Sequence, residues 1–369
     1  MNYPYLASLE IGVSTSPKSL AKKIALLGGG FAKANILIYV GLRSAPPNLV
    51  SATQVPQEKP SAQPKPQEKP SAQSDEPIEL VVTGEQDGYR VPNATTATRT
   101  DTPILDIPQS IEVVPQQVIK DQQVTRLKEA LSNISGVTFN GTTNGRGDTY
   151  NLRGFNNAPV LQDGFRIYNT EQPIKEVADL ERVEVLKGPA SILYGDAQPG
   201  GIINLVTKKP LKDPFYEVEQ QFGNRNFLRS SVDISGPLNS DGSLLYRLNG
   251  LYTQGDSFQN YDNQNQRYLI SPTFSWKISD RTDLNVSLRY FDDQSPVAFG
   301  LPAQGNRVVD VPRDRIANEP NDSSITKTYL STGYDLEHRF SENWKLHSAF
   351  HYLNYDSNTG VVVAPFALR

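Results

Sequence analysis

Beyond Phe215 the chain alternates apolar and polar residues over long segments, and this period of two limits the possible folds more than any other feature. Between Leu244 and Tyr252 the even positions carry apolar, aromatic or glycine residues, whereas Arg247 and Asn249 stand at odd positions. Successive side chains of a β-strand point to opposite faces of the sheet, so the pattern predicts strands with one apolar and one polar face. The alternation recurs in three later segments, at 268–276, 284–290 and 344–352.

Two classes of protein share this alternation, a soluble antiparallel sandwich and a transmembrane β-barrel. The predicted strands have about ten residues or more, which exceeds the usual length in globular sheets and matches a tilted crossing of a bilayer. Aromatic residues such as Tyr252, Tyr290 and Trp344 lie toward strand ends, as at a membrane interface. Short predicted turns, as at 279–282, alternate with longer loops, as at 255–266. This asymmetry is typical of outer-membrane barrels, so the sequence favours that class.

We expect the barrel to be incomplete within residues 213–369, because only about seven strands fit there. A closed barrel of about eight strands is filled by its own side chains, whereas about 22 strands can surround a further domain. The predicted fold is therefore an all-β transmembrane β-barrel, present as a partial wall, that encloses an N-terminal α/β domain. The side chains predicted to point outward are Leu248, Ile270, Leu288 and Leu346. Those predicted to point inward are Arg247, Arg289 and Lys345.

Residues 1–52 have the features of a secretory signal peptide. Lysines precede a mostly apolar stretch over residues 24–42, and small residues at 50–52 suit signal peptidase. A single membrane-spanning helix is the alternative, but glycines and Lys33 interrupt the stretch, which falls short of the roughly 20 apolar residues that a span needs. We expect the mature chain to begin near Thr53.

A proline-rich linker occupies residues 53–76, where the heptapeptide Gln-Glu-Lys-Pro-Ser-Ala-Gln occurs at 57–63 and again at 67–73. Such a composition stays solvated because it cannot bury a core. An arm follows at 77–98 and begins with a β-prone run. The members of this run are Ile78, Glu79, Leu80, Val81, Val82 and Thr83. The run can add itself as a strand to the sheet edge of a partner, or it can be the first strand of the next domain.

Residues 99–212 predict a compact α/β domain. Pro115 stands at the first position of a helix over 116–123, and Thr125 caps a second helix that ends at Gly136. The second helix presents one apolar face, made by Leu127, Ala130, Leu131 and Ile134. Short strands separated by glycine-rich turns are expected around 150–152, 160–162 and 182–186.

Residues suited to catalysis or metal binding are few. The chain has no Cys, and its three His are His338, His347 and His351, which excludes thiol chemistry and Cys-based metal, haem or iron-sulfur sites. The net charge of -4 provides no basic field for nucleic acid. Asp292 and Asp293 adjoin in a predicted loop, where carboxylates are solvated, and no nucleophile stands with a base. We therefore expect no catalysis, no cofactor, no bound metal and no nucleic-acid partner.

Several blocks within residues 106–210 resemble the successive motifs of the plug of a TonB-dependent receptor. The most specific is Leu-Glu-Arg-Val-Glu-Val-Leu-Lys-Gly-Pro-Ala-Ser-Ile-Leu-Tyr-Gly at 180–195, which continues through Pro-Gly-Gly-Ile-Ile-Asn to Thr-Lys-Lys-Pro. The other blocks are Asp-Ile-Pro-Gln-Ser-Ile at 106–111, Leu-Lys-Glu-Ala-Leu at 127–131, Leu-Arg-Gly-Phe at 152–155 and Asp-Gly at 163–164. The resemblance runs from about Ile78 to Arg369. Gly-Leu-Pro at 300–302 and Val-Pro-Arg at 311–313 resemble ferric siderophore receptors of the ferrichrome type.

This resemblance implies an outer-membrane protein whose plug gates the import of a ferric siderophore through the barrel. It also implies that Ile78 to Thr83 is the TonB box, which pairs edge to edge with TonB and its inner-membrane energising complex. In the family, ligand is held by outward plug apices and barrel loops, where an Arg donor and aromatic walls suit an anionic chelate. The contacts implied by position are Arg146, Asn156, Asn157, Tyr168 and Asn169.

Arg153 and Arg182 lie on predicted plug strands, where contact with the ligand is one alternative. We favour the other, in which both pair with carboxylates of the barrel wall. The glycines of residues 188–201 are interpreted as turns that let the plug backbone pass close to that wall. The three His are interpreted as wall residues, because iron in such ligands arrives already chelated. Import of cobalamin, haem or a glycan is an alternative within the family. A passive porin is the alternative outside it, and the plug motifs and the candidate TonB box count against the porin.

Overall fold

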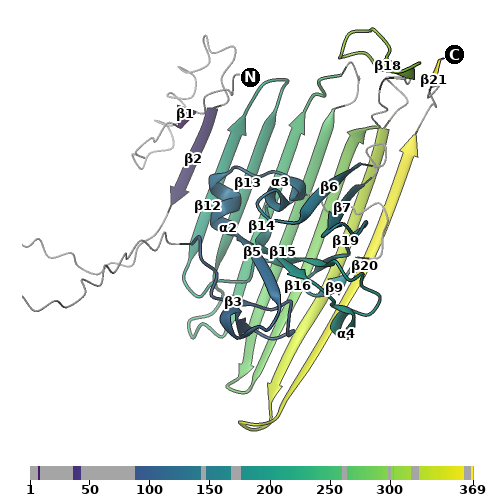
Figure 1. The fold of residues 1–369 in the computed structure, drawn as a ribbon. Helices are drawn as coiled ribbons and strands as arrows, with labels where there is room; N and C mark the ends of the chain where they lie inside the picture. Colours follow the sequence, from purple (N-terminus) through teal and green to yellow (C-terminus); the bar gives the residue numbers. More distant parts are fainter. Residues whose placement is uncertain are drawn as a thin grey trace, which may run out of the picture.

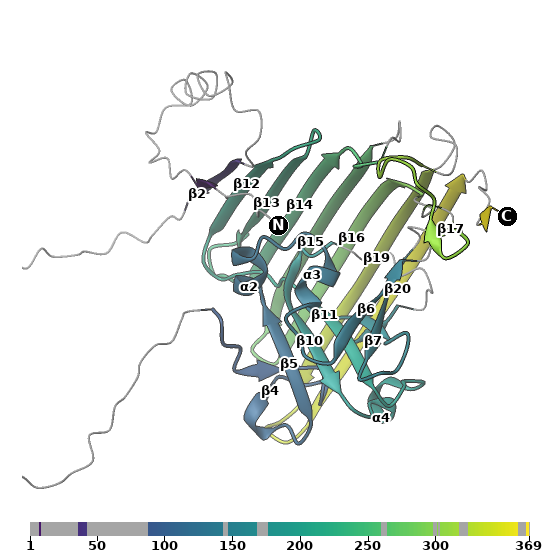
Figure 2. The same cartoon turned by 45° about the horizontal axis from the view of Figure 1, so that its top comes forward.

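The computed structural model describes residues 7–8, 36–42, 88–142, 147–167, 176–259, 264–297, 301, 303–316, 324–360 and 367–368. They form an open wall of long strands with a smaller α/β unit against one face (Figures 1 and 2). Within this part of the chain, no helix is both long enough and apolar enough to cross a membrane.

The wall contains seven long strands that pair antiparallel in chain order, as the alternation predicted. They are β12 (Phe215–Phe222), β13 (Leu228–Pro237), β14 (Leu244–Gly255), β15 (Asn265–Ser279), β16 (Thr282–Pro296), β19 (Ser324–Arg339) and β20 (Lys345–Gly360). The later strands have 15 or 16 residues, long enough to cross a bilayer at a tilt. Among the described residues β20 ends the sheet, so the wall does not close.

The opposite edge of the wall is covered. Strand β2 (Ile36–Leu42) pairs antiparallel with β12, and β1 (Ala7–Ser8) pairs with β2. The sequence did not predict this pairing, because Ile36–Leu42 belongs to the predicted signal peptide. The pairing satisfies backbone groups that an uncovered edge would leave open. Signal cleavage near Thr53 stays a prediction.

The two faces of the wall differ as predicted. On the outward face Ile270, Leu288 and Leu346 are 48%, 42% and 49% exposed, whereas Arg247 and Arg289 on the inner face are 3% exposed. Lys345 lies opposite Arg339 in register, on the inner face, and its exposed side chain pairs with Glu337 at 3.4 Å. Leu248 is half-buried between the buried Arg247 and Asn249, as alternation along β14 requires. Further exposed aromatics on the outward face are Tyr216, Tyr268, Phe274, Trp276, Tyr290, Tyr334, Phe350 and Tyr352.

The α/β unit is built on a five-stranded sheet in the order β5-β10-β11-β8-β9. These strands are β5 (Ser110–Pro115), β10 (Leu180–Lys187), β11 (Gly201–Thr207), β8 (Val160–Gln162) and β9 (Phe165–Arg166). A hairpin joins β6 (Val137–Thr142) to β7 (Asp148–Leu152), and a shorter one joins β3 (Asn93–Ala94) to β4 (Thr102–Pro103). Small elements in the connections are η1 (Ile104–Asp106), α4 (Ser191–Tyr194), β17 (Ala303–Gln304), β18 (Arg307–Val308) and β21 (Ala367–Leu368).

The two predicted helices form, but their ends differ from expectation. Helix α2 is Gln116–Asp121, and Pro115 is its N-cap because it still belongs to β5 with extended ψ. Helix α3 is Leu127–Leu131, and it is capped by the Glu129 carboxylate, which accepts from the amides of Thr125 and Arg126 at 2.8 and 3.1 Å. Helix α3 ends at Leu131, five residues before Gly136, where we had expected the end. The predicted apolar face is correct, since Leu127, Ala130, Leu131 and Ile134 are all buried.

The glycines of residues 188–201 do allow a close approach, but not to the wall. A Cβ on Gly201 would lie 2.0 Å from the carbonyl oxygen of Leu186, and one on Gly200 would lie 2.3 Å from that of Leu152. Both obstructing groups belong to the α/β unit itself. Glycine is therefore required at these positions for packing within the unit. The expectation that these glycines approach the barrel wall was wrong.

Candidate functional site

Most of the ligand contacts implied by the resemblance lie outside the described residues. Arg146, Tyr168 and Asn169 fall there, as does the candidate TonB box from Ile78 to Thr83. Asn156 and Asn157 are described, and both are exposed in the connection between β7 and β8. All these assignments stay predictions. The described residues instead define the interface between the α/β unit and the inner face of the wall.

Three wall arginines grip one short segment of the α/β unit that leads into β10. Arg229 on β13 donates to both oxygens of Glu176, at 2.7 and 3.1 Å, and Arg267 on β15 lies 3.7 Å from the same carboxylate. Arg289 on β16 holds Asp179 through two hydrogen bonds, at 2.6 and 3.2 Å. The three arginines occupy odd positions on their strands, so the pleat directs them to the same face.

Glu176 and Asp179 are buried, at 0% and 1% exposure, and their charges are compensated. Glu176 also accepts from the backbone amides of Val177 and Ala178, at 3.0 and 3.1 Å. Burial alone would raise the pKa of Glu176, but the facing guanidinium of Arg229 and these hydrogen bonds outweigh it and lower the pKa to about 2. The carboxylate is therefore ionised at any physiological pH.

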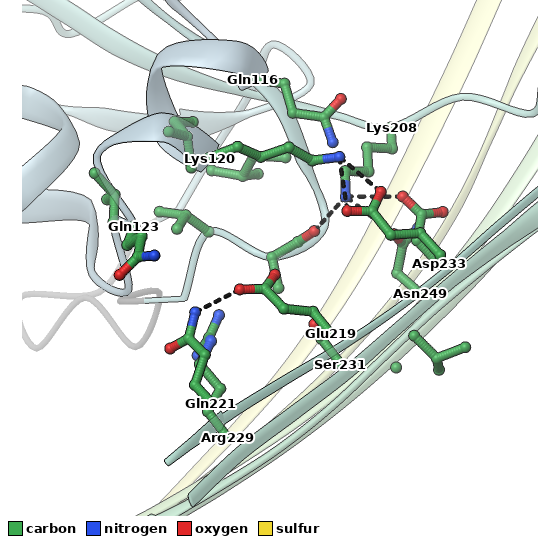
Figure 3. Close-up of a pocket in the computed structure, with 18 residues that line it drawn as sticks. Gln116, Lys120, Gln123, Lys208, Glu219, Gln221, Arg229, Ser231, Asp233 and Asn249 are labelled. Atoms are coloured by element: carbon green, nitrogen blue, oxygen red, sulfur yellow. Dashed lines mark hydrogen bonds and ion pairs between the residues drawn. The ribbon is translucent and has the colours of Figure 1, made fainter. Parts of the chain in front are cut away.

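A second charged cluster lies nearer β12, where α2 faces the wall (Figure 3). Lys208 donates to Asp233 at 2.9 Å and to the carbonyl of Ala178 at 2.7 Å, while Arg247 holds the same Asp233 at 2.8 Å. Burial lowers the pKa of Lys208, and Asp233 opposes this effect. On α2 itself, Lys120 pairs with Glu217 at 2.6 Å. The cluster borders a cavity of about 70 Å³, which is far smaller than a ligand pocket.

Apolar contacts lie between and beyond these charged clusters. Leu251, Leu269, Phe291 and Tyr329 point inward from four wall strands and join the main core of the α/β unit. The Tyr329 hydroxyl donates to Gln162 on β8 at 3.1 Å, which adds a polar contact between the wall and the α/β unit. The α/β unit and the wall therefore share one core.

Several sequence expectations for this interface need correction. Arg182 donates to Glu184 at 2.6 Å, within the α/β unit, and exposed Arg153 forms no ion pair with a described residue. The ion pairs across the interface run in both directions. The unit carboxylates Glu176 and Asp179 meet wall arginines, which reverses the expected polarity, whereas the wall carboxylates Asp233 and Glu217 meet lysines of the enclosed unit. Asp293 is not in a solvated loop: it lies on β16, 2% exposed, and binds Arg267 at 2.9 Å. Our expectation failed because β16 extends to Pro296.

The three histidines are wall residues. His338 contacts Thr282 at 2.8 Å, His347 contacts Asp335 at 2.5 Å, and His351 stacks on Phe165 with ring centroids 5.3 Å apart. Among the described residues, no group of His, Asp and Glu is arranged to hold a metal ion.

Glu176 and Asp179 were missed by sequence reasoning. They stand beside the apolar residues Val177, Ala178 and Leu180, and nothing in their own spacing marks them. The available signal was on the other side of the interface, where Arg229, Arg267 and Arg289 interrupt the inner faces of otherwise regular strands.

A strand wall with an apolar outer face and an α/β unit fastened to its inner face is the architecture of an outer-membrane receptor with a plug. The TonB-dependent Receptor Plug Domain family matches residues 103–202. The metal-pseudopaline receptor CntO of Pseudomonas aeruginosa is 35% identical over 322 residues, covering 86% of this chain and 43% of that protein. The ferrichrome outer membrane transporter/phage receptor of Escherichia coli is 34% identical over 269 residues, covering 68% and 35%.

Solved structures agree with this assignment. The P. aeruginosa protein FpvA, bound to a heterologous pyoverdine, superposes with a TM-score of 0.63 at 28% identity, covering 71% of this chain and 36% of that one. The chain belongs to the TonB-dependent receptors of the outer membrane, and it combines their plug with part of their barrel. It spans 43% of the length of CntO.

Proposed function

We propose that the protein imports a metal ion held by a small organic chelator, with ferric siderophores as the substrate class, across the outer membrane. Relatives named for ferrichrome, ferrioxamine B and pseudopaline support this class. TonB is the proposed energy source, acting on the box from Ile78 to Thr83, and outer-membrane lipid covers the outward face of the wall. No catalytic step is assigned.

The observation that carries the gating role is the charged seam formed by Glu176 and Asp179 with the wall arginines. Buried ion pairs are a weak source of stability, because apolar residues of similar volume often stabilise as well or better. Their groups are, however, readily solvated once separated, whereas separated apolar surfaces are not. A seam of this kind suits a plug that must be firmly seated at rest and must leave its seat when pulled.

The ligand side of the proposal rests on the plug apices. Arg146 offers a cationic donor, Asn156, Asn157 and Asn169 offer amides, and Tyr168 offers an aromatic wall. Of these five residues, the structure describes only Asn156 and Asn157. Both are exposed, as a contact with ligand requires. A passive porin fits less well, because the plug occupies the inner face of the wall and is held there by ion pairs.

Uptake by the full-length receptor tests this proposal. We expect radiolabelled ferric siderophore to accumulate in cells that contain TonB and to be bound without accumulation in cells that lack it. Leu80→Pro should abolish accumulation and spare binding, since proline removes a backbone donor needed for strand addition. Ser74→Pro in the proline-rich linker is the matched control. Accumulation without TonB would support the porin, and preferential uptake of cobalamin or haem would replace the substrate class.

A further inference from the structure

Among the described residues of the arm that follows the candidate TonB box, Thr96 is the one fully buried polar residue. Upstream of it, the side chain of Ala94 is also buried but makes only apolar contacts. The side-chain hydrogen bonds upstream are exposed ones, such as the bond that the Tyr89 hydroxyl donates to Asp121 on α2. Thr96 itself is 0% exposed. It follows Thr83 by about 13 residues, or about 45 Å of extended chain.

Every polar group of Thr96 has a partner in the plug, on β10, β11 or α4. Its backbone amide and its hydroxyl both donate to the Glu184 carboxylate, at 2.9 and 2.5 Å. Its hydroxyl oxygen accepts from the Asn204 amide at 2.9 Å, and its carbonyl accepts from the Tyr194 hydroxyl at 2.7 Å. The neighbouring amide of Thr95 donates to Glu184 at 3.1 Å. We call this set, Thr96 with Glu184, Asn204 and Tyr194, the arm clasp.

Glu184 lies where a pull on the arm would reach the centre of the plug. It is on β10, paired in register with Val113 of β5 on one side and Asn204 of β11 on the other. Its side chain is 0% exposed, and Arg182 donates to it at 2.6 Å. A buried carboxylate that accepts several charge-assisted hydrogen bonds is costly to separate from its donors.

We propose that the arm clasp transmits tension from the arm to the central plug sheet, and that release of Thr96 from Glu184 is the first step of plug rearrangement. The inference rests on the proposed function for the pull on Ile78 to Thr83. The hydrogen bonds upstream are exposed and yield first, because water competes with them. The clasp therefore sets the tension at which the arm separates from β10.

Single-molecule pulling on the arm of the full-length receptor in lipid vesicles tests the clasp without any transport. Thr96→Val keeps the shape and removes the hydroxyl, which leaves Glu184 and Asn204 each short of one partner. We expect its first release rate under load to rise about tenfold or more, since hydrogen bonds to charged groups are the stronger class. Glu184→Gln should act in the same direction.

Two controls separate the clasp from general damage. Thr96→Ser keeps every hydrogen bond and should release as the unmodified receptor does. Thr98→Val makes the same chemical change at an exposed residue whose hydroxyl bonds only to the nearby Thr100 and Thr102, and should also change nothing. Without load, hydrogen exchange at the amides of Thr95 and residue 96 should be faster in Thr96→Val and Glu184→Gln.

Unchanged first release in both Thr96→Val and Glu184→Gln would overturn the clasp, even if uptake proves to depend on TonB. The two proposals can also be separated by the opposite outcome. If uptake does not depend on TonB but release is faster in the variants, the proposed energy source fails while the mechanical role of the clasp stands.

Discussion

On strand β16 the neighbours Leu288 and Arg289 point to opposite faces of the wall, and they meet different requirements. Leu288 is 42% exposed on a face that needs only to be apolar, and many side chains could satisfy it. Arg289 is 3% exposed and holds Asp179 by two hydrogen bonds whose geometry few side chains could reproduce. The outer face is therefore specified by composition, and the inner face by individual partners.

The largest effect is expected where one partner of the inner face is removed. Glu176→Gln leaves the buried guanidiniums of Arg229 and Arg267 without their shared plug carboxylate, which should destabilise the seated plug by about 3 to 5 kcal/mol. Denaturant unfolding of the full-length receptor in detergent, followed by protease susceptibility of the plug, measures this. Lys277→Ala is the control, because its ion pair with Asp280 is exposed and should contribute nothing measurable. Equal effects of the two substitutions would show that the inner face is not specific.

A smaller effect is expected when an arginine is placed on the outer face, at the position next to Arg289. Leu288→Arg places a guanidinium toward lipid near the middle of β16 with no carboxylate to meet it, which should cost about 2 to 4 kcal/mol of insertion or unfolding free energy. Reversible folding into lipid vesicles measures the loss. Leu288→Ile should cost about 1.5 kcal/mol or less, because it remains apolar. A tolerated arginine would contradict contact of this face with lipid.

The smallest effect is a pH dependence confined to the inner face. Because the folded-state pKa of Glu176 is lowered from 4.5 to about 2, its contribution is fully present above about pH 4.5 and is lost as pH falls toward 2. At about pH 3.5 we expect a loss of about 1 kcal/mol in plug seating. Unfolding measured at pH 7 and at pH 3.5 checks this value. Glu176→Gln should remove this part of the dependence, and a profile identical to that of the unmodified receptor would refute the assignment.

The wall was the more predictable region. Its strands follow from a period of two that each strand carries alone, so Ile270, Leu346 and the inward Arg247 could be placed without knowledge of their neighbours. The limits of β16 were predicted less well, because Asp293 is polar and suggested a loop. In the structure a facing Arg267 compensates its charge, and the strand continues.

The plug was predictable in its motifs and helices but not in its contacts. Leu127 and Leu131 were expected on one buried face of α3, and they lie there. Arg182, however, was expected to pair with a carboxylate of the wall, and it pairs with Glu184 of the plug instead. Nothing in the local sequence decides between a carboxylate of the wall and that of Glu184, since either would satisfy the guanidinium of Arg182.

By itself the sequence determined the class of strand, the face on which each wall residue lies, and the order of the plug motifs. These depend on local periodicity and on short-range turn chemistry, which are written in consecutive residues. Only the tertiary structure decided that Glu176 meets Arg229 and that Thr96 meets Glu184, residues separated by 53 and 88 positions. Such pairs are selected by which buried charges and amides are brought together when separate elements pack, because a buried polar group must find a partner wherever the fold supplies one.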